Sequence, residues 1–164
     1  MDFQELKDEL LERAKEKGAC IDGYKQGMNA KDKNDLLKAI TGNFEWVYRN
    51  KVVDSKLLEE NFTPEELWEH GIYTSGQNEV RGNNLIFACG SATVKAYGSA
   101  TVKAYGSATV EAYGSATVKA YSNSYVENCT GNVMVPQSDY AIVKDYYKHK
   151  LYVKKGKLEI IEIE

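Results

Sequence analysis

An eight-residue repeat in the second half of the chain constrains the fold more than any other feature of the sequence. The motif GSATVKAY occurs at residues 90–97, 98–105 and 114–121, and GSATVEAY occurs at residues 106–113. Carried outward in the same frame, related octads extend over residues 82–145, which makes eight octads. Self-similarity at a fixed period is typical of a repeat architecture.

Within each of the four near-identical octads, small apolar residues alternate with polar ones. Positions three, five and seven are Ala, Val and Ala, and the positions between them are Ser, Thr, Lys or Glu, and Tyr. The fifth position is aliphatic or Met in all eight octads: Ile86, Val94, Val102, Val110, Val118, Val126, Met134 and Ile142. Alternation with a period of two predicts strands that bury one face.

The alternation also discriminates between arrangements of these strands. In an antiparallel meander with Gly-Ser turns, Tyr97 would pair with Ala100 and Val94 with Lys103, so each face would mix apolar and charged residues. In a parallel solenoid, each strand stacks on a strand that runs the same way, so equivalent positions meet. We therefore predict a parallel β-solenoid.

The size of the inward side chains indicates how wide the solenoid is. A triangular coil of three octads would enclose an interior that Ala, Val and Ala cannot fill at native packing density. A flattened coil of two octads needs only a thin core. We predict two octads per coil and four coils, with three octads per coil as the alternative.

Two octads per coil would stack the outward side chains in rows. One sheet would carry Lys95, Glu111 and Glu127 in a row, and the other would place Lys103 over Lys119. The candidate binding residues are the tyrosines and charged residues of these rows: Tyr97, Tyr105, Tyr113, Tyr121, Lys95, Lys103, Lys119 and Glu111. Rows of Tyr and Thr also stabilise an exposed parallel sheet through cross-strand packing, without any ligand.

The segment before the repeat, residues 1–75, predicts a small helical domain. Apolar residues recur at helical spacing in residues 3–14 and again in residues 36–47. Thr63, Pro64 and Glu66 match a capping box with proline in the first turn, which predicts a short helix that ends at Gly71.

The segment after the repeat, residues 146–164, predicts a cap on the other end of the solenoid. Lys155 and Gly156 separate two apolar runs, which is typical of a β-hairpin. The outer octads carry apolar residues at outward positions: Leu85, Phe87, Val133, Val135, Ala141 and Val143. We expect the helical domain to cover the first coil and the hairpin to cover the last, because an open solenoid end exposes unpaired backbone groups.

These expectations define an α+β chain with three parts. The helical N-terminal domain spans residues 1–75, the octapeptide-repeat β-solenoid spans residues 82–145, and the C-terminal β-hairpin cap spans residues 146–164.

The composition excludes several classes of protein. The net charge is -3, whereas a protein that binds duplex DNA without sequence preference is strongly basic, so this class is excluded. The charged start and the lack of a long apolar stretch favour a cytoplasmic protein without a membrane partner. Cys20, Cys89 and Cys129 are an odd number at unrelated spacings, which indicates free thiols, and no Cys/His cluster predicts a metal site.

The repeat also argues against an enzyme. A nucleophilic serine needs unique surroundings, whereas Ser91, Ser99, Ser107 and Ser115 have near-identical neighbours. The glycines recur at every eighth position as turns and do not form a phosphate-binding GxGxxG motif. We predict no catalytic residue, no cofactor and no metal.

The run GSATVKAYGSATVKAYGSATVEAYGSATVKAY resembles the ATVxAY-type octapeptide repeats in proteins of bacteriophages, prophages and mobile elements, notably from gut bacteria. The preceding segment, FEWVYRNKVVDSKLLEENFTPEELWEHGIY, is similar to the helical leader of some of these proteins. The resemblance implies a phage or mobile-element source, and a protein that serves a phage structure or blocks a host defence. It assigns no site residues.

Our leading hypothesis is a non-catalytic protein that binds another macromolecule, as an anti-CRISPR-like inhibitor of a host defence system would. Residues 1–72 carry 11 basic and 16 acidic side chains, so this acidic part is the expected surface for a basic protein partner. One alternative is a structural or self-assembling spacer. A second is nucleic-acid, nucleotide or glycan binding on the Tyr and Lys rows, because bases and sugars stack on aromatic rings.

Overall fold

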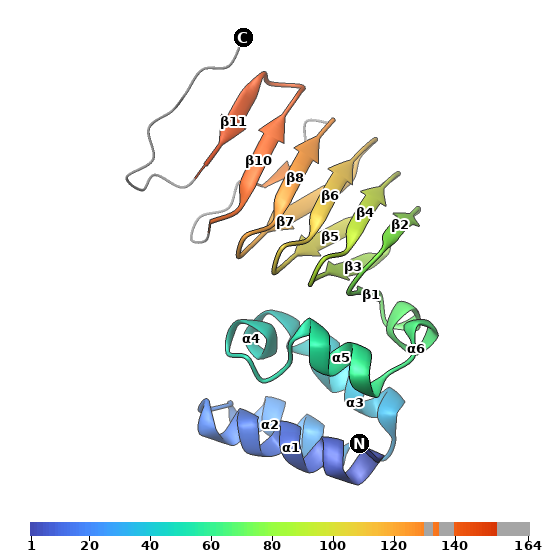
Figure 1. The fold of residues 1–164 in the computed structure, drawn as a ribbon, viewed down its shortest axis with the longest axis vertical. Helices are drawn as coiled ribbons and strands as arrows, with labels where there is room; N and C mark the ends of the chain where they lie inside the picture. Colours follow the sequence, from blue (N-terminus) through green and yellow to red (C-terminus); the bar gives the residue numbers. More distant parts are fainter. Residues whose placement is uncertain (130–132, 135–139, 154–164) are drawn as a thin grey trace.

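A computed structural model describes residues 1–129, 133–134 and 140–153, and it shows a helical domain followed by a two-sheet parallel solenoid (Figure 1). The helices of the described chain are α1 (Phe3–Glu16), α2 (Ile21–Asn29), α3 (Lys33–Gly42), α4 (Phe44–Arg49), α5 (Ser55–Asn61) and α6 (Pro64–Glu69). α1, α3 and α4 contain the apolar residues that recur at helical spacing, whereas no such spacing was identified for α2.

Polar side chains cap most of these helices. Asp2, Asp32 and Asp54 each accept a hydrogen bond from a backbone N–H in the first turn of α1, α3 and α5. The predicted capping box of α6 is confirmed, because Thr63 Oγ1 accepts from the N–H of Glu66 and the Glu66 carboxylate accepts from the N–H of Thr63. Such caps satisfy the first donors of a helix, which have no partner within it.

The strands form two sheets that lie face to face. One sheet contains β1 (Ile72–Tyr73), β3 (Leu85–Ala88), β5 (Thr101–Ala104), β7 (Thr117–Ala120) and β9 (Val133–Met134), in that order. The other contains β2 (Gln77–Val80), β4 (Thr93–Ala96), β6 (Thr109–Ala112), β8 (Tyr125–Asn128), β10 (Ile142–Asp145) and β11 (Lys150–Tyr152). Because consecutive octads alternate between the sheets, the predicted coil of two octads is confirmed.

The register is the one that the repeat predicts. Val94 pairs with Val110 in one sheet and Val102 pairs with Val118 in the other, so each residue stacks on its equivalent two octads further along the chain. The valine side chains are 0% exposed, and alanines on either side of each valine fill the rest of the space between the sheets. A thin core of Ala and Val is therefore sufficient.

Glycine is required at the corners of the coils. Gly90 has φ +60°, and a Cβ atom there would lie 2.5 Å from the carbonyl oxygen of Thr74 in the preceding coil. A side chain at this corner would therefore meet both backbone strain and a steric clash.

The frame of the last two octads differs from the prediction. We expected Met134 and Ile142 to occupy the inward fifth position, but the register pairs Val133 with Val118 and Val143 with Val126. In a regular coil, paired residues are two octads apart in the sequence. Val133 lies one residue nearer to Val118 than this spacing, and Val143 lies one residue further from Val126. In β10, a shift of one position turns every side chain to the opposite face of the strand.

The consequence of this shift is seen in β10. Val143 and Ala141 are 0% exposed, whereas Ile142 is 39% exposed. The expectation that Ala141 and Val143 lie on the outside of the solenoid was therefore wrong, because the core takes the residues that pair with the preceding coil.

The solenoid begins before the first octad. β1 pairs with β3, with Ile72 opposite Phe87, and β2 pairs with β4, with Asn78 opposite Val94. These two strands lack the GSATV motif but continue both sheets toward the helices. A partial coil therefore joins the helical domain to the repeat.

A C-terminal β-hairpin is present, and its first strand is the last strand of the solenoid. β10 pairs antiparallel with β11, with Val143 opposite Tyr152, and residues 146–149 form the turn. The predicted turn at Lys155 and Gly156 lies outside the described residues.

An aromatic cluster docks the helical domain on the solenoid. The ring of Phe44 in α4 lies 4.4 Å from that of Phe87 and 5.3 Å from that of Tyr105, and the Tyr48 ring lies 5.5 Å from that of Tyr105. The Tyr48 hydroxyl also accepts a hydrogen bond from the N–H of Gly90 at 3.3 Å. The helices thus cover Phe87, as expected, while Leu85 stays 47% exposed.

Tyr105 allows this docking contact to be tested. Its side chain is 0% exposed, and its hydroxyl has no hydrogen-bond partner among the described residues. We expect Tyr105→Phe to raise the free energy of unfolding by about 1 kcal/mol, because it removes an unsatisfied buried polar group. Tyr105→Ala should lower it by about 3 to 5 kcal/mol through the lost ring contacts. Urea denaturation of both variants measures these changes, and a less stable Tyr105→Phe protein would contradict this account.

Candidate functional site

The sheet that contains β4, β6 and β8 carries the predicted charged row. The register places Lys95, Glu111 and Glu127 on successive strands. Lys95 Nζ lies 3.3 Å from Glu111 Oε2, and the same oxygen accepts a hydrogen bond from the Tyr113 hydroxyl at 2.8 Å. The candidate residues of this row are therefore brought together, and they bind one another.

The tyrosines at the end of the same strands form a stack. The rings of Tyr97 and Tyr113 are 5.0 Å apart and nearly parallel, at 11°. The guanidinium of Arg81 lies over Tyr97, 4.5 Å from the ring centroid. Tyr97 therefore already has two ring partners, and a base or a sugar ring would have to displace one of them.

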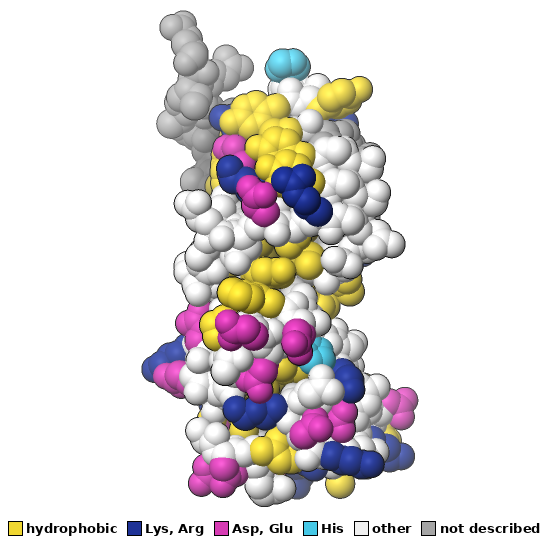
Figure 2. Space-filling view, turned by 90° about the vertical axis from the view of Figure 1, so that its right-hand side faces the viewer, with side chains coloured by type: hydrophobic (Ala, Val, Ile, Leu, Met, Phe, Trp, Pro, Cys, Tyr) yellow, Lys and Arg dark blue, Asp and Glu magenta, His cyan; other side chains and the backbone are white. Residues whose placement is uncertain are grey.

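Figure 2 shows one side of the solenoid, where hydrophobic side chains lie among both basic and acidic ones. This mixture fits a surface whose side chains form ion pairs, hydrogen bonds and ring contacts with one another. The described residues of these rows thus fit a stabilising ladder, the interpretation that the sequence left open.

The other sheet brings its candidate residues together as well. Lys103 pairs with Lys119, and the rings of Tyr105 and Tyr121 stack at 4.9 Å and 5°. Tyr105, however, is buried against α4, and the Tyr121 hydroxyl donates to Glu45 at 3.4 Å. Because the helical domain covers the Tyr105 ring, a ligand cannot stack on it.

Hydrogen bonding perturbs the acidity of Tyr113. Its hydroxyl donates to the Glu111 carboxylate, and this bond raises the pKa of Tyr113 to about 12. The Tyr113–Glu111 hydrogen bond favours the protonated phenol over the phenolate in the folded state. Its contribution to the free energy of unfolding is therefore complete below the ordinary tyrosine pKa and is lost as pH rises toward 12.

The acidic excess of the helical part is confined to α5 and α6. Residues 1–53 carry ten basic and ten acidic side chains, whereas residues 54–69 carry one basic and six acidic side chains. The acidic residues of this face are Asp54, Glu59, Glu60, Glu65, Glu66 and Glu69. We call these residues, with Trp68, the acidic face.

Two of the carboxylates have structural roles and the others lie in solvent. Asp54 and Glu66 serve in the caps of α5 and α6, while Glu59, Glu65 and Glu69 are exposed. Trp68 is 48% exposed among them, with its ring 6.5 Å from that of Tyr73. The sequence analysis did not identify this exposed Trp or the acidic residues around it. A charge count over shorter segments would have located the acidic residues in residues 54–69.

The joint between α5 and α6 is fixed from α3. Lys33 Nζ donates to the carbonyl oxygen of Asn61 at 2.6 Å and lies 5.6 Å from the centroid of the Phe62 ring. Figure 2 looks onto the α6 side and shows acidic side chains where the helices meet the solenoid. These contacts hold the joint between α5 and α6 against α3.

The described part of the chain contains no group of three His, Cys, Asp or Glu side chains placed to hold a metal ion. Among the same residues, no helix combines the length and the apolar character needed to cross a bilayer. No protein-family model, no curated protein and no solved structure matches the chain.

The Tyr113–Glu111 pair gives a direct test of the ladder. We expect Glu111→Gln to lower the pKa of Tyr113 from about 12 toward its ordinary value, because the charged acceptor is lost. The Tyr113 Cζ chemical shift, followed through a pH titration of 13C-tyrosine-labelled protein, reports this change. Glu127→Gln is the control, since its carboxylate accepts from Tyr125 and its loss should leave Tyr113 unchanged.

Proposed function

We propose that this chain is a non-catalytic binding protein whose acidic face contacts a basic surface of a protein partner. The observation that carries the proposal is the concentration of charge: residues 54–69 supply six acidic and one basic side chain on two adjoining short helices. The preceding helices are balanced in charge, so this face dominates the electrostatic field of the helical part.

One residue of the acidic face, Trp68, is of a type that is enriched in protein–protein interfaces. Trp is enriched among the residues that contribute most to binding, and a partly exposed Trp68 offers an apolar anchor. The surrounding carboxylates would form a charged rim, which steers a basic partner and sets its orientation. A surface that evolved to bind nucleic acid directly would carry the opposite charge.

The solenoid would serve as the rigid support of this face. The helical domain is docked on it by packed aromatic rings. On the solenoid, Lys95 binds Glu111 and the ring of Tyr97 stacks on that of Tyr113. A preorganised surface loses less conformational entropy on binding. This arrangement favours binding by contact over a chemical role.

The resemblance of the repeats to phage and mobile-element proteins supports a specific version of the proposal. Proteins that cut or bind nucleic acid present basic surfaces, and an acidic face that covers such a surface would inhibit them. We therefore propose that the partner is a nucleic-acid-binding defence protein of the host bacterium, inhibited in the manner of an anti-CRISPR protein.

Affinity capture with matched charge variants tests this proposal. The tagged protein is incubated with host-cell lysate, and captured proteins are identified by mass spectrometry and quantified. Glu59→Gln, Glu65→Gln and Glu69→Gln together should weaken binding of the purified partner at least about tenfold and reduce its dependence on salt. Trp68→Ala should cost about 2 kcal/mol, which is roughly thirtyfold in Kd.

The control removes the same number of charges at another place. Asp8, Glu12 and Glu16 are exposed on α1, so Asp8→Asn, Glu12→Gln and Glu16→Gln change the net charge equally and should leave binding unchanged. Equal loss in both triple variants would mean that net charge alone acts and would contradict a defined acidic face. Capture of the chain only by itself would favour a self-assembling spacer instead.

A further inference from the structure

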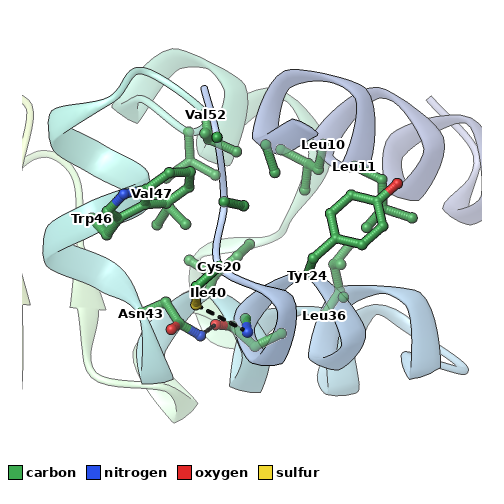
Figure 3. A pocket seen from close by; sticks show the side chains of 17 residues that line it. Leu10, Leu11, Cys20, Tyr24, Leu36, Ile40, Asn43, Trp46, Val47 and Val52 are labelled. Atoms are coloured by element: carbon green, nitrogen blue, oxygen red, sulfur yellow. Dashed lines mark hydrogen bonds between the residues drawn. The ribbon is translucent and has the colours of Figure 1, made fainter. Parts of the chain in front are cut away.

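The helical domain contains a cavity that the acidic face does not use. The cavity has a volume of about 290 Å³ and lies between α1, α2, α3 and α4 (Figure 3). Leu10, Leu11, Leu36 and Ile40 form much of its wall, and Trp46 closes the side formed by α4. We propose that this cavity is a binding site for an uncharged, mainly apolar small molecule.

The chemistry of the wall defines the class of ligand. None of the 17 residues that line the cavity carries a charge, and most are aliphatic or aromatic. A charged ligand would lose its hydration without gaining a partner. The wall residues with polar side-chain atoms are Asn43, Tyr24, Cys20 and Trp46, which suffice to orient one hydroxyl or N–H group.

The volume defines the size of the ligand. A cavity of about 150 Å³ lined by aliphatic and aromatic side chains holds benzene. The present cavity, at about 290 Å³, is roughly twice as large and fits two fused rings or a short alkyl chain. The expected ligand therefore has about ten to fourteen non-hydrogen atoms.

Helix α2 forms a cover that can be displaced at low cost. It contains no buried residue, although Tyr24, Gly23 and Gly27 line the cavity. Two glycines within this short helix weaken it, because glycine gains more backbone freedom on unfolding than any other residue. Its N-cap is also weak, since Cys20 Sγ accepts from the N–H of Gly23 at 3.4 Å, where other helices use Asp or Thr oxygens.

The two glycines also shape the cavity. A Cβ atom at Gly27 would lie 3.1 Å from Leu11 Cδ2, and one at Gly23 would lie 3.3 Å from Cys20 Sγ. Side chains at these positions would therefore press on the wall residues. A hydrogen bond from Asn43 Nδ2 to Gln26 Oε1, at 2.9 Å, holds α2 against the junction of α3 and α4. A helix that is intrinsically weak, yet latched over an apolar cavity, gives a ligand both an entry path and an apolar wall to pack against.

Calorimetric titration with 1-naphthol tests the proposal on the full-length protein. We expect binding of one equivalent with a Kd of about 10 to 100 µM, as ligands of this size reach in apolar sites. The ionised 1-naphthoate, which has the same rings and a charge, should bind at least about tenfold more weakly. 1-Decanol in a parallel titration separates a preference for aromatic rings from a preference for alkyl chains, and binding of either supports the proposal.

A thiol at the wall reports where the ligand binds. Cys20 lines the cavity and is exposed, while Cys129 is exposed on the solenoid. Saturating 1-naphthol should slow the alkylation of Cys20 by iodoacetamide at least about threefold and leave Cys129 unchanged, as measured by mass spectrometry. Equal rates at Cys20 with and without the ligand would place it elsewhere and overturn the assignment.

Filling the cavity gives the matched variant. Ala39 lines the cavity from α3, so Ala39→Leu should reduce the affinity for 1-naphthol at least about tenfold, whereas Lys38→Leu adds the same side chain at an exposed position and should not. If Ala39→Leu does not fold, Ala14→Leu fills the cavity from α1 and carries the same expectation.

Three results overturn the proposal. They are undiminished binding to a folded cavity-filling variant, an unchanged alkylation rate of Cys20 when the ligand is bound, and no heat change with either 1-naphthol or 1-decanol at its solubility limit. None of these results bears on the acidic face, because the measurements use no protein partner.

Discussion

The rest of the structure depends on the stacking of like residues on like at an interval of one coil. Because Val94 lies over Val110 and Val102 lies over Val118, a core of Ala and Val closes without any large side chain. The same rule applies to the outside of the coil, where it would stack lysine on lysine. Like charges directly opposite one another are destabilising, so an uninterrupted repeat has an intrinsic electrostatic cost.

One of the four near-identical octads differs from the others by a single residue, and this residue reduces the electrostatic cost of stacking lysines. Glu111 stands where the other three octads have Lys, and it forms an ion pair with Lys95 in the preceding coil. It then faces Glu127 in the next coil, but Tyr113 and Tyr125 donate hydrogen bonds to the two carboxylates. In the other sheet Lys103 lies over the Phe87 ring, 5.7 Å from its centroid, which provides a favourable contact beside Lys119. The outward residues thus have a structural explanation.

Much of this architecture could be predicted from the sequence, because a repeat reduces the problem to one octad. The alternation of Ala and Val with polar residues predicted the parallel stacking, the two-octad coil and the paired tyrosines. What the sequence did not reveal depends on contacts between unlike segments. Tyr105 and Tyr113 belong to almost identical octads, yet Tyr105 is buried because α4 packs on it. Likewise, the frame of β10 changes by one position, and only the pairing of Val143 with Val126 reveals it.

Helix α4 connects the two parts of the molecule and bears on both proposals. Phe44 and Tyr48, one turn apart, face the solenoid, whereas Trp46 and Val47 line the cavity between α1 and α3. A ligand that packs against Trp46 would therefore restrict the helix that docks the domain. By linkage, such a ligand stabilises the docked state to the extent that it binds that state more tightly. The acidic face lies on α5 and α6, which connect α4 to β1. Its orientation therefore depends on the packing of Phe44 and Tyr48 against the solenoid. On these two proposals, a ligand in the cavity would act on the acidic face through the short helix α4.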